Sequence, residues 1–493
     1  MKKTSLARLL ALLLVAIMSI SFLAACGGNG DNGDKGGNKD DDKFEHTDED
    51  PKIAATDYDE YEFTFICQPY LDSNAYSVNY MVSESETGDT LLDAVYRRNE
   101  LLAEKYNITF AQMQVKDLVT TVRTQVMGGV TEFDMIVGSC GKLATLAKEN
   151  LLLNLNSVDR FDMTKSYWDS NAAEQLLVGD KLYFTNCDLN VQEVAFVVYF
   201  NKQMIEDYEL TSPYEYMAND TWTIDNWKNL VMSVSKDVNG DGEMTATDVY
   251  GTLHEHHNAR MFLYGAGVRA TTNNEAGVPE VTLFKTDKTV TVYEKCKEVF
   301  NSISSWSIDD MNSEEKHGYN DKYDYARSLF CQDLYLFHYE GTNIIHQFAD
   351  MEHEFGIVPF PKYDTNQAEY YSMYPFNCAM IAIPNSLTGE DLERTANIVE
   401  DLNYYSSIIL KPKWYDTLLS RRYTRDDESE KSLDIILEGR VYDVGMYYDF
   451  GGIRKDILDQ DARRSNITQL YARKQKSIQA EINATYRDFG LVD

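Results

Sequence analysis

The segment from residue 63 to 139 alternates between strand-like and helix-like patterns, and this alternation limits the fold more than any other feature. Three short apolar runs are typical of strands, and the two runs between them carry apolar residues at helical spacing. In chain order the five runs are 63 to 70, 91 to 106, 107 to 115, 117 to 129 and 133 to 139. This order predicts an α/β fold, with a mostly parallel sheet and helices on its faces.

Polar or small residues follow two of these predicted strands. Gln68, Pro69 and Tyr70 end the first strand, and Gly138 and Ser139 end the third. Ligands of open α/β sheets bind beyond the carboxyl ends of the strands. We therefore expect Gln68, Tyr70 and Ser139 to contact a bound molecule.

The rest of the chain continues the alternation. Residues 193 to 205 form a long apolar run that leads from a strand into a helix. Shorter strand-like runs cover 334 to 341, 355 to 361 and 379 to 384, and 465 to 489 has apolar residues at helical spacing. No segment repeats at a fixed period, which disfavours solenoids and propellers.

The N-terminus has the pattern of a secretory leader. Three cations precede an apolar run that ends in small residues before Cys26. The Leu-Ala-Ala-Cys sequence resembles the bacterial lipobox, in which the leader, here 1 to 25, is cleaved and the cysteine receives fatty acyl chains such as palmitate. A membrane-spanning anchor is the alternative, because the run nearly reaches the length that a bilayer requires.

Residues 26 to 57 are rich in Gly, Asp, Asn and Lys. Such a segment buries too little apolar surface to offset the entropy of ordering it. We expect a disordered acidic tether that spans roughly 30 Å. The globular body then begins near Tyr58 and, at roughly 435 residues, is long enough for two or three domains.

The chain is strongly acidic. Its formal net charge is −34, and loss of the three cations of the leader would make it −37. This charge repels the phosphates of nucleic acids and anionic lipid head groups, so nucleic acid is not an expected partner.

The cysteines other than Cys26 are scattered singly, without a C-x-x-C pair, so neither a zinc nor a redox site is expected from them. Buried thiols are the preferred interpretation, and disulfides are the alternative that an exported protein permits. These cysteines are Cys67, Cys140, Cys187, Cys296, Cys331 and Cys378.

Residues 237 to 248 have the spacing of a calcium-binding loop, with Gly242 at the turn position. The run after Asp248 is strand-like, so the helix pair of a calcium sensor is not expected. We predict a structural Ca²⁺ clip, with a solvated acidic turn or a dockerin loop as alternatives. Its ligands would be Asp237, Asn239, Asp241, Glu243 through its carbonyl, Thr245 through water, and Asp248.

A helix is expected to lead into this loop. Thr223 is placed to cap it, and Trp222 and Trp227 occupy the two positions of a hydrophobic staple. We therefore predict that both tryptophans pack in the core and do not stack on sugars.

Several segments occur in an order typical of one protein family. Residues 197 to 251 run from a strand through Asn-Lys, a helix, a Trp-Thr helix start and a Gly-Asp-Gly loop to Tyr-Gly. Residues 355 to 364 and 421 to 445 follow with further family-like strands and helices. Behind a lipobox and a tether, this order resembles an extracellular solute-binding lipoprotein of an ABC importer, of the maltose-type carbohydrate-binding class (family 1).

The resemblance implies a two-lobed periplasmic-binding-protein-like fold of type II, with a hinge and an interlobe cleft. Lobe 1 would take residues 58 to 190 with a return segment at about 379 to 415, and lobe 2 would take 195 to 370 with about 416 to 493. The chain would cross between the lobes near 187 to 194 and near 373 to 380.

The resemblance also implies the function. A monomer, anchored by a lipid to the outer face of the membrane, would capture a solute by lobe closure and deliver it to an ABC permease. The many tyrosines indicate an oligosaccharide, with a peptide or another small solute as alternatives. We do not expect an enzyme, since the sequence has no G-x-S-x-G, P-loop or G-x-G-x-x-G motif. A secreted carbohydrate-active hydrolase stays an alternative, because its paired carboxylates come together in the fold and leave no motif in the sequence.

The segment from His254 to His257 does not complete the zinc-protease motif HExxH, because Asn258 stands where the second histidine is required. Its polar residues lie where the family's second lobe faces the solute, with surface histidines as the alternative. Half-buried packing is the alternative for the tyrosines of the expected ligand loops. The predicted contacts in these segments are Glu255, His256, His257, Tyr339, Glu340, Asn343, Asp443, Tyr447 and Tyr448.

Overall fold

The structure, a computed structural model, describes residues 47–69, 81–190, 194–275, 277–311, 318–348, 351–418 and 426–491. The predicted leader, Cys26, most of the tether and Tyr70 lie outside the described residues. Within these ranges, none of the helices has both the length and the apolarity that crossing a membrane requires.

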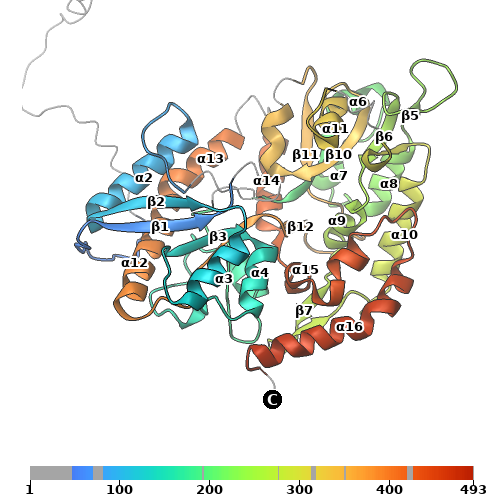
Figure 1. Ribbon diagram of the computed structural model, residues 1–493. Coiled ribbons are helices and arrows are strands. Elements are labelled where there is room, and N and C mark those ends of the chain that lie inside the picture. The colour runs from blue at the N-terminus through green and yellow to red at the C-terminus, as the bar shows by residue number, and fades with distance from the viewer. Residues whose placement is uncertain are drawn as a thin grey trace, which may run out of the picture. The chain divides into compact units, whose positions relative to one another are not determined.

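Strands and helices alternate along the described chain (Figure 1). The strands are β1 (Tyr61–Cys67), β2 (Ile108–Gln114), β3 (Met135–Ser139), β4 (Phe196–Asn201), β5 (Ser235–Lys236), β6 (Val249–His254), β7 (Thr271–Asn273), β8 (Pro279–Val281), β9 (Ser305–Ser307), β10 (Tyr335–Gly341), β11 (Phe355–Val358), β12 (Ser372–Met373), β13 (Ala379–Ala382) and β14 (Arg440–Val441). The α-helices are α2 (Thr90–Tyr106), α3 (Leu118–Gly128), α4 (Cys140–Lys148), α5 (Ser170–Gln175), α6 (Lys202–Asp207), α7 (Pro213–Ala218), α8 (Ile224–Met232), α9 (Asn258–Gly265), α10 (Lys288–Phe300), α11 (Lys322–Phe330), α12 (Gly389–Tyr405), α13 (Lys411–Leu418), α14 (Asp427–Glu438), α15 (Val444–Tyr448) and α16 (Ile467–Asp488). Short 3₁₀ or π segments are η2 (Leu155–Ser157), η3 (Ile308–Asp310), η4 (Thr342–Phe348), η5 (Ser406–Leu410), η6 (Phe450–Gly452) and η7 (Arg454–Leu458).

The first sheet has the order β13-β3-β1-β2. Strand β1 pairs in parallel with both β2 and β3, as the alternation between residues 63 and 139 predicts. Strand β13 comes from late in the chain and adds an antiparallel edge to β3. Helices α3 and α4 pack against each other, and α2 packs against α12 (Figure 1).

The second sheet has the order β11-β4-β10-β6-β5, with β9 also paired to β6. Strand β6 is parallel to β10 and to β9, whereas β4 is antiparallel to β10 and β11. The strands predicted within 193 to 205, 334 to 341, 355 to 361 and 379 to 384 are confirmed as β4, β10, β11 and β13. Strands β1 to β3 thus lie in the first sheet and β4 to β6 in the second. The lobe boundaries stay a prediction.

Helix α8 illustrates how local sequence sets the elements near the acidic loop. The Thr223 hydroxyl accepts a hydrogen bond from the Asn226 amide at 3.4 Å, which caps the helix. Trp222 and Trp227 are fully buried, so the packing role predicted for them is confirmed. Their indole nitrogens donate to Pro359 O at 2.8 Å and to the hydroxyl of Tyr339 at 2.9 Å.

Residues 47 to 57 correct the predicted end of the tether. The amide of Thr47 donates to the hydroxyl of Tyr404 at 3.1 Å, and the Ser166 amide donates to Glu49 at 3.0 Å. Ile53 is only 9% exposed and joins the main hydrophobic core. The tether was therefore predicted too long at its carboxyl end, because one apolar residue and polar contacts with distant parts of the chain are enough to dock this segment.

None of the six described cysteines forms a disulfide, and all but Cys331 are buried. This agrees with the preferred interpretation of buried thiols. Burial raises the pKa of Cys67 to about 11, so this thiol stays protonated at neutral pH.

Candidate functional site

Gln68 and Ser139 lie together at the carboxyl end of the first sheet. Cys67 pairs with Val137 in the parallel register of β1 and β3, so Gln68 and Ser139 follow at the same end of neighbouring strands. Gln68 is 2% exposed, and its Oε1 is buried without a hydrogen-bond partner. Ser139 is 6% exposed and does not cap α4 with its side chain. An acceptor that is buried and unpartnered in the protein alone is available to a donor from a ligand.

Glu255 and Glu340 occupy the matching end of the second sheet. Phe337 pairs with Thr252 in the parallel register of β10 and β6. Glu340 in β10 and Glu255, just after β6, each stand three residues further along the chain. Glu340 accepts from the Arg327 Nε and lies 3.0 Å from the His338 Nε2. Its carboxylate is therefore already paired within the protein.

The Glu255 carboxylate has one paired and one unpaired oxygen. Oε1 lies 2.7 Å from the Nε2 of His257, whereas Oε2 is buried without a hydrogen-bond partner. Burial would raise the pKa of Glu255, but the hydrogen bond from His257 lowers it, so the group is ionised. Burial lowers the pKa of His257, which favours its neutral form.

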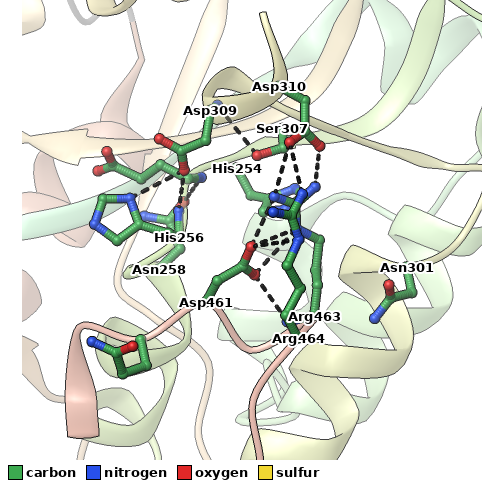
Figure 2. Close-up of polar contacts among 12 residues, drawn as sticks. His254, His256, Asn258, Asn301, Ser307, Asp309, Asp310, Asp461, Arg463 and Arg464 are labelled. Carbon is green, nitrogen blue, oxygen red and sulfur yellow. Dashed lines mark hydrogen bonds and ion pairs between the residues drawn. The ribbon is translucent and has the colours of Figure 1, made fainter. Parts of the chain in front are cut away.

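His256 is oriented by Asp309, which follows β9. The His256 amide donates to Asp309 Oδ2 at 2.6 Å, and the ring Nδ1 lies 3.1 Å from the same oxygen (Figure 2). This hydrogen bond raises the pKa of His256. Lys322 pairs with the other oxygen of Asp309 at 2.5 Å, so the aspartate links α11 to the end of β6.

The surroundings of β6 also contain a partly exposed ionic network. Arg463 contacts Asp310 and donates from its Nε to Asp461 at 3.1 Å (Figure 2). His254, the last residue of β6, is 2% exposed and stacks on Phe300 with ring centroids 4.2 Å apart. Burial lowers the pKa of His254 to about 3, so it is neutral at physiological pH.

A second polar cluster was not predicted from the sequence. Arg260 in α9 is 2% exposed and forms an ion pair with Asp459, which also binds Arg454 at 2.7 Å. The Arg454 guanidinium lies 3.9 Å from the ring centroid of Phe376, and the Phe376 carbonyl accepts from the Gly141 amide at 3.1 Å. The one available sequence signal was an arginine inside the otherwise apolar helix α9.

Four predicted contacts point into the protein interior. The Tyr339 hydroxyl is hydrogen-bonded to Trp227 and Thr252, and the Asp443 carboxylate accepts from Tyr264, Ala270, Thr271 and Gly445. Tyr447 donates to Tyr374 O at 2.9 Å, and Tyr448 is 3% exposed among aromatic rings. The polar groups of the first three have partners within the protein, which gives all four packing roles. Asn343 in η4 is half-buried, and it has no such packing role assigned. Tyr70 lies outside the described residues.

The acidic loop between β5 and β6 folds on its own backbone. Asp237 accepts from the Gly240 and Gly242 amides at 2.7 and 2.8 Å. Asn239 Oδ1 accepts from the Asp241 amide, and Asp241 Oδ1 accepts from the Glu243 amide, at 2.9 and 2.8 Å. Buried Asp248 closes the loop by accepting from the Val238 and Thr245 amides at 2.8 and 2.7 Å. The strand predicted after Asp248 is confirmed as β6.

Comparison with known proteins places this architecture in a family. The model of the bacterial extracellular solute-binding proteins matches residues 102–402 of the chain. A search of curated proteins gives no match.

Three solved structures illustrate the similarity in fold. The cyclic α-maltosyl-1,6-maltose binding protein from Arthrobacter globiformis is 13% identical, with a TM-score of 0.55 over 85% of this chain and 98% of that chain. The maltose-binding periplasmic protein from Listeria monocytogenes, in complex with maltose, is 11% identical, with a TM-score of 0.53 over 86% and 98%. An ABC substrate-binding protein from Listeria monocytogenes, in complex with cycloalternan, is 13% identical, with a TM-score of 0.51 over 88% and 100%.

At these identities the solved structures show the fold, and they confirm the predicted two-lobed α/β class. The family model extends from α2 to α12 and covers more than half of the 493 residues. The chain belongs to the bacterial extracellular solute-binding protein family.

Proposed function

We propose that the protein captures an oligosaccharide outside the cell for an ABC importer, held to the membrane by a lipid on Cys26, and that it catalyses no reaction. The observation that carries the proposal is the likeness of 85% or more of the chain to three sugar-binding proteins of known structure. Two of them were solved with maltose or cycloalternan, and the third is named for a cyclic maltosyl-maltose.

The polar groups at the carboxyl ends of the two sheets support a solute rich in hydroxyls. Gln68 Oε1 and Glu255 Oε2 are both buried acceptors without a partner in the protein alone. Each sugar hydroxyl can donate one hydrogen bond and accept others, so it can complete such acceptors. Ser139 and Asn343 add groups that can donate or accept.

Capture follows from the use of both sheets. A solute that contacts Gln68 on one sheet and Glu255 on the other makes its full set of hydrogen bonds in the closed conformation only. It therefore shifts the population toward the closed form by the difference in its affinity for the two forms. The permease then receives the closed, loaded form.

A thermal-shift screen of the full chain against α- and β-linked oligosaccharides, peptides and polyols tests the proposal. A bound sugar at 100 times its Kd should add about 2.7 kcal/mol to the free energy of unfolding. The same samples are analysed for products. Sugar hydrolysis, or stabilisation by peptides alone, would contradict the proposal.

Gln68→Leu sharpens the test. We expect at least tenfold weaker sugar binding, because the leucine accepts no hydrogen bond. The melting temperature without sugar should hold or rise, because an unpartnered buried acceptor is removed. Gln332→Leu, at an exposed position, is the matched control and should change neither quantity.

The lipid anchor is tested independently of the solute. Mass spectrometry of the membrane-bound protein should find acyl chains on an N-terminal Cys26, and Cys26→Ala should release the protein into the medium. An unmodified protein that stays in the membrane after this substitution would favour the spanning anchor instead.

We also propose that the acidic loop holds Ca²⁺ as a structural ion. Its side chains supply the oxygen ligands that Ca²⁺ prefers, and Gly242 takes the positive φ of 86° that the turn at position 6 requires. The ligands proposed are Asp237, Asn239, Asp241 and Asp248 through side-chain oxygens, Glu243 through its carbonyl, and Thr245 through water.

A further inference from the structure

We propose that Glu255, His256 and His257 form a binding site for a divalent transition-metal ion of the zinc type. The three residues follow β6 directly, and one ligand atom of each lies within 4.8 Å of the other two. The sequence argues only against a zinc-protease helix, because that motif places its histidines one helical turn apart. Here the turn between β6 and α9 brings consecutive side chains together instead.

The spacing of the ligand atoms suits a small ion. Zinc binds imidazole nitrogen and carboxylate oxygen at about 2.0 to 2.2 Å, which places the ligands of a tetrahedral site about 3.4 Å apart. The Glu255 Oε1 to His257 Nε2 distance is 2.7 Å, so this pair separates slightly as the ion replaces the shared proton. Side-chain shifts of about 1 Å complete the three-ligand set and leave a fourth position to water.

Glu255 provides an independent indication of a missing ligand. The residue is 8% exposed, and its Oε2 makes no hydrogen bond within the protein. The Tyr323 phenol is a further neighbour of this carboxylate, since burial and then the charge of Glu255 and a hydrogen bond to it raise the pKa of Tyr323. A buried ionised carboxylate that lacks a partner is costly. A cation held by Oε1 offsets that cost and leaves Oε2 available to a hydroxyl of the solute.

Asp309 completes the arrangement from outside the ligand set. Its Oδ2 lies 3.1 Å from the His256 Nδ1, which fixes the ring and leaves the Nε2 lone pair for a metal. A carboxylate that holds the second nitrogen of a ligating histidine is a common feature of zinc sites. Asp309 is therefore a positioning residue and not a ligand.

The ligand types and their exposure favour zinc over calcium. Imidazole nitrogen suits zinc, copper and nickel, whereas calcium takes oxygen ligands. The His256 side chain is 40% exposed and that of His257 is 18% exposed, so an ion can reach the site from solvent. Lys322, which pairs with Asp309, adds an opposing positive charge and limits the affinity.

Isothermal titration of the full chain with zinc chloride at pH 7.5, in calcium-containing buffer, tests the site. We expect one zinc ion per chain and at least tenfold weaker binding in Glu255→Gln and in His257→Gln. Asp309→Asn should weaken binding between 10-fold and 100-fold. Wild-type affinity should fall steeply below about pH 6, because both imidazoles must lose their protons to bind.

Two controls keep the result decisive. His353→Gln removes a histidine of the same 40% side-chain exposure that pairs with Asp333, and it should bind zinc as the wild type does. Melting curves in EDTA establish that each variant folds. His257→Gln, at a ligand more exposed than Glu255, serves if Glu255→Gln does not fold. Absence of zinc binding by the wild type, or undiminished binding by folded His257→Gln, overturns the proposal.

Discussion

Strand β6 joins two polar regions of opposite construction. At its amino end, the loop from Asp237 to Asp248 satisfies its carboxylates with amides of the same twelve residues. At its carboxyl end, Glu255 is buried, and the neighbouring His256 is held by Asp309, 53 residues further along the chain. The first region is built from local contacts and the second from long-range contacts.

This difference predicts where a substitution changes the stability of the fold most. A loop that bonds to its own backbone and faces solvent depends little on the rest of the fold. A buried charge depends on its partners, because removing one partner leaves the other without compensation. We therefore expect large effects at the carboxyl end of β6 and small effects at the amino end.

Arg260→Met should give the largest loss of stability. Arg260 is 2% exposed and pairs with Asp459, which would keep only its 2.7 Å contact with Arg454. Breaking a buried ion pair costs about 3 to 5 kcal/mol, and the remaining arginine places the expected loss near about 3 kcal/mol. Urea unfolding of the full chain measures it.

Arg97→Met is the control for this prediction. Arg97 pairs with Glu86 at the surface, where the two side chains are 49% and 53% exposed. Its loss should cost less than about 1 kcal/mol. An equally small loss of stability in Arg260→Met would contradict the expected difference between buried and exposed ion pairs.

Tyr339→Phe tests the interior that lies between the two ends of β6. The lost hydroxyl is bonded to the Trp227 indole at 2.9 Å and to Thr252 at 2.7 Å. Leaving a buried donor without a partner costs about 1 to 3 kcal/mol. Urea unfolding should show this loss while sugar affinity stays unchanged.

The solvent-exposed Tyr319 supplies the control, since Tyr319→Phe should not change stability. A Tyr339→Phe protein with wild-type stability but weak sugar binding would contradict the packing role of Tyr339 and show that its hydroxyl contacts the solute.

Much of this architecture follows from sequence patterns. The alternation of apolar runs predicts the parallel strands β1, β2 and β3, since helix and strand periods are local properties. Thr223 is identified as a cap for the same reason. The pairing of Arg260 with Asp459, and of His256 with Asp309, joins distant segments and leaves no local pattern.

The tyrosines show the same limit within the predicted site. Tyr339 and Tyr447 lie in segments where the family resemblance places ligand loops, yet their hydroxyls bond to Trp227, Thr252 and Tyr374. A tyrosine satisfies a core position and a sugar contact equally well. Only the position of its hydroxyl partners separates these roles, and no sequence pattern gives that position.

Arg463→Met and Arg464→Met compare a buried and an exposed cation beside the same carboxylates. The Arg463 side chain is 11% exposed and that of Arg464 is 71% exposed, while both contact Asp310 and Asp461 (Figure 2). Loss of Arg463 should cost roughly 1.5 kcal/mol at pH 7, and loss of Arg464 less than about 0.5 kcal/mol. Equal losses would show that burial does not set the difference.

The effect of Arg463→Met should also depend on pH. Burial would raise the pKa of Asp461, but its hydrogen bonds and the charge of Arg463 lower it overall. A carboxyl whose pKa is lowered by folding stabilises the folded state at pH values above its unfolded pKa of about 3.9. This contribution to stability is lost as the pH falls through the folded-state pKa. The gap between wild type and Arg463→Met should therefore shrink below about pH 4, in unfolding curves measured from pH 7 to pH 3.

Chelation of calcium should give the smallest effect, because the carboxylates of the acidic loop also accept hydrogen bonds from the loop's own amides. A ligand present at ten times its Kd adds about 1.4 kcal/mol, and weak extracellular sites bind near millimolar calcium, so EDTA should remove about 1 kcal/mol or less. Asp237→Asn should abolish the calcium response, and Asp416→Asn, at an exposed helical position, should keep it. Calorimetry with and without calcium measures both. A loss above about 3 kcal/mol would mean that the amino end of β6 depends on its ion as strongly as the carboxyl end depends on its buried partners.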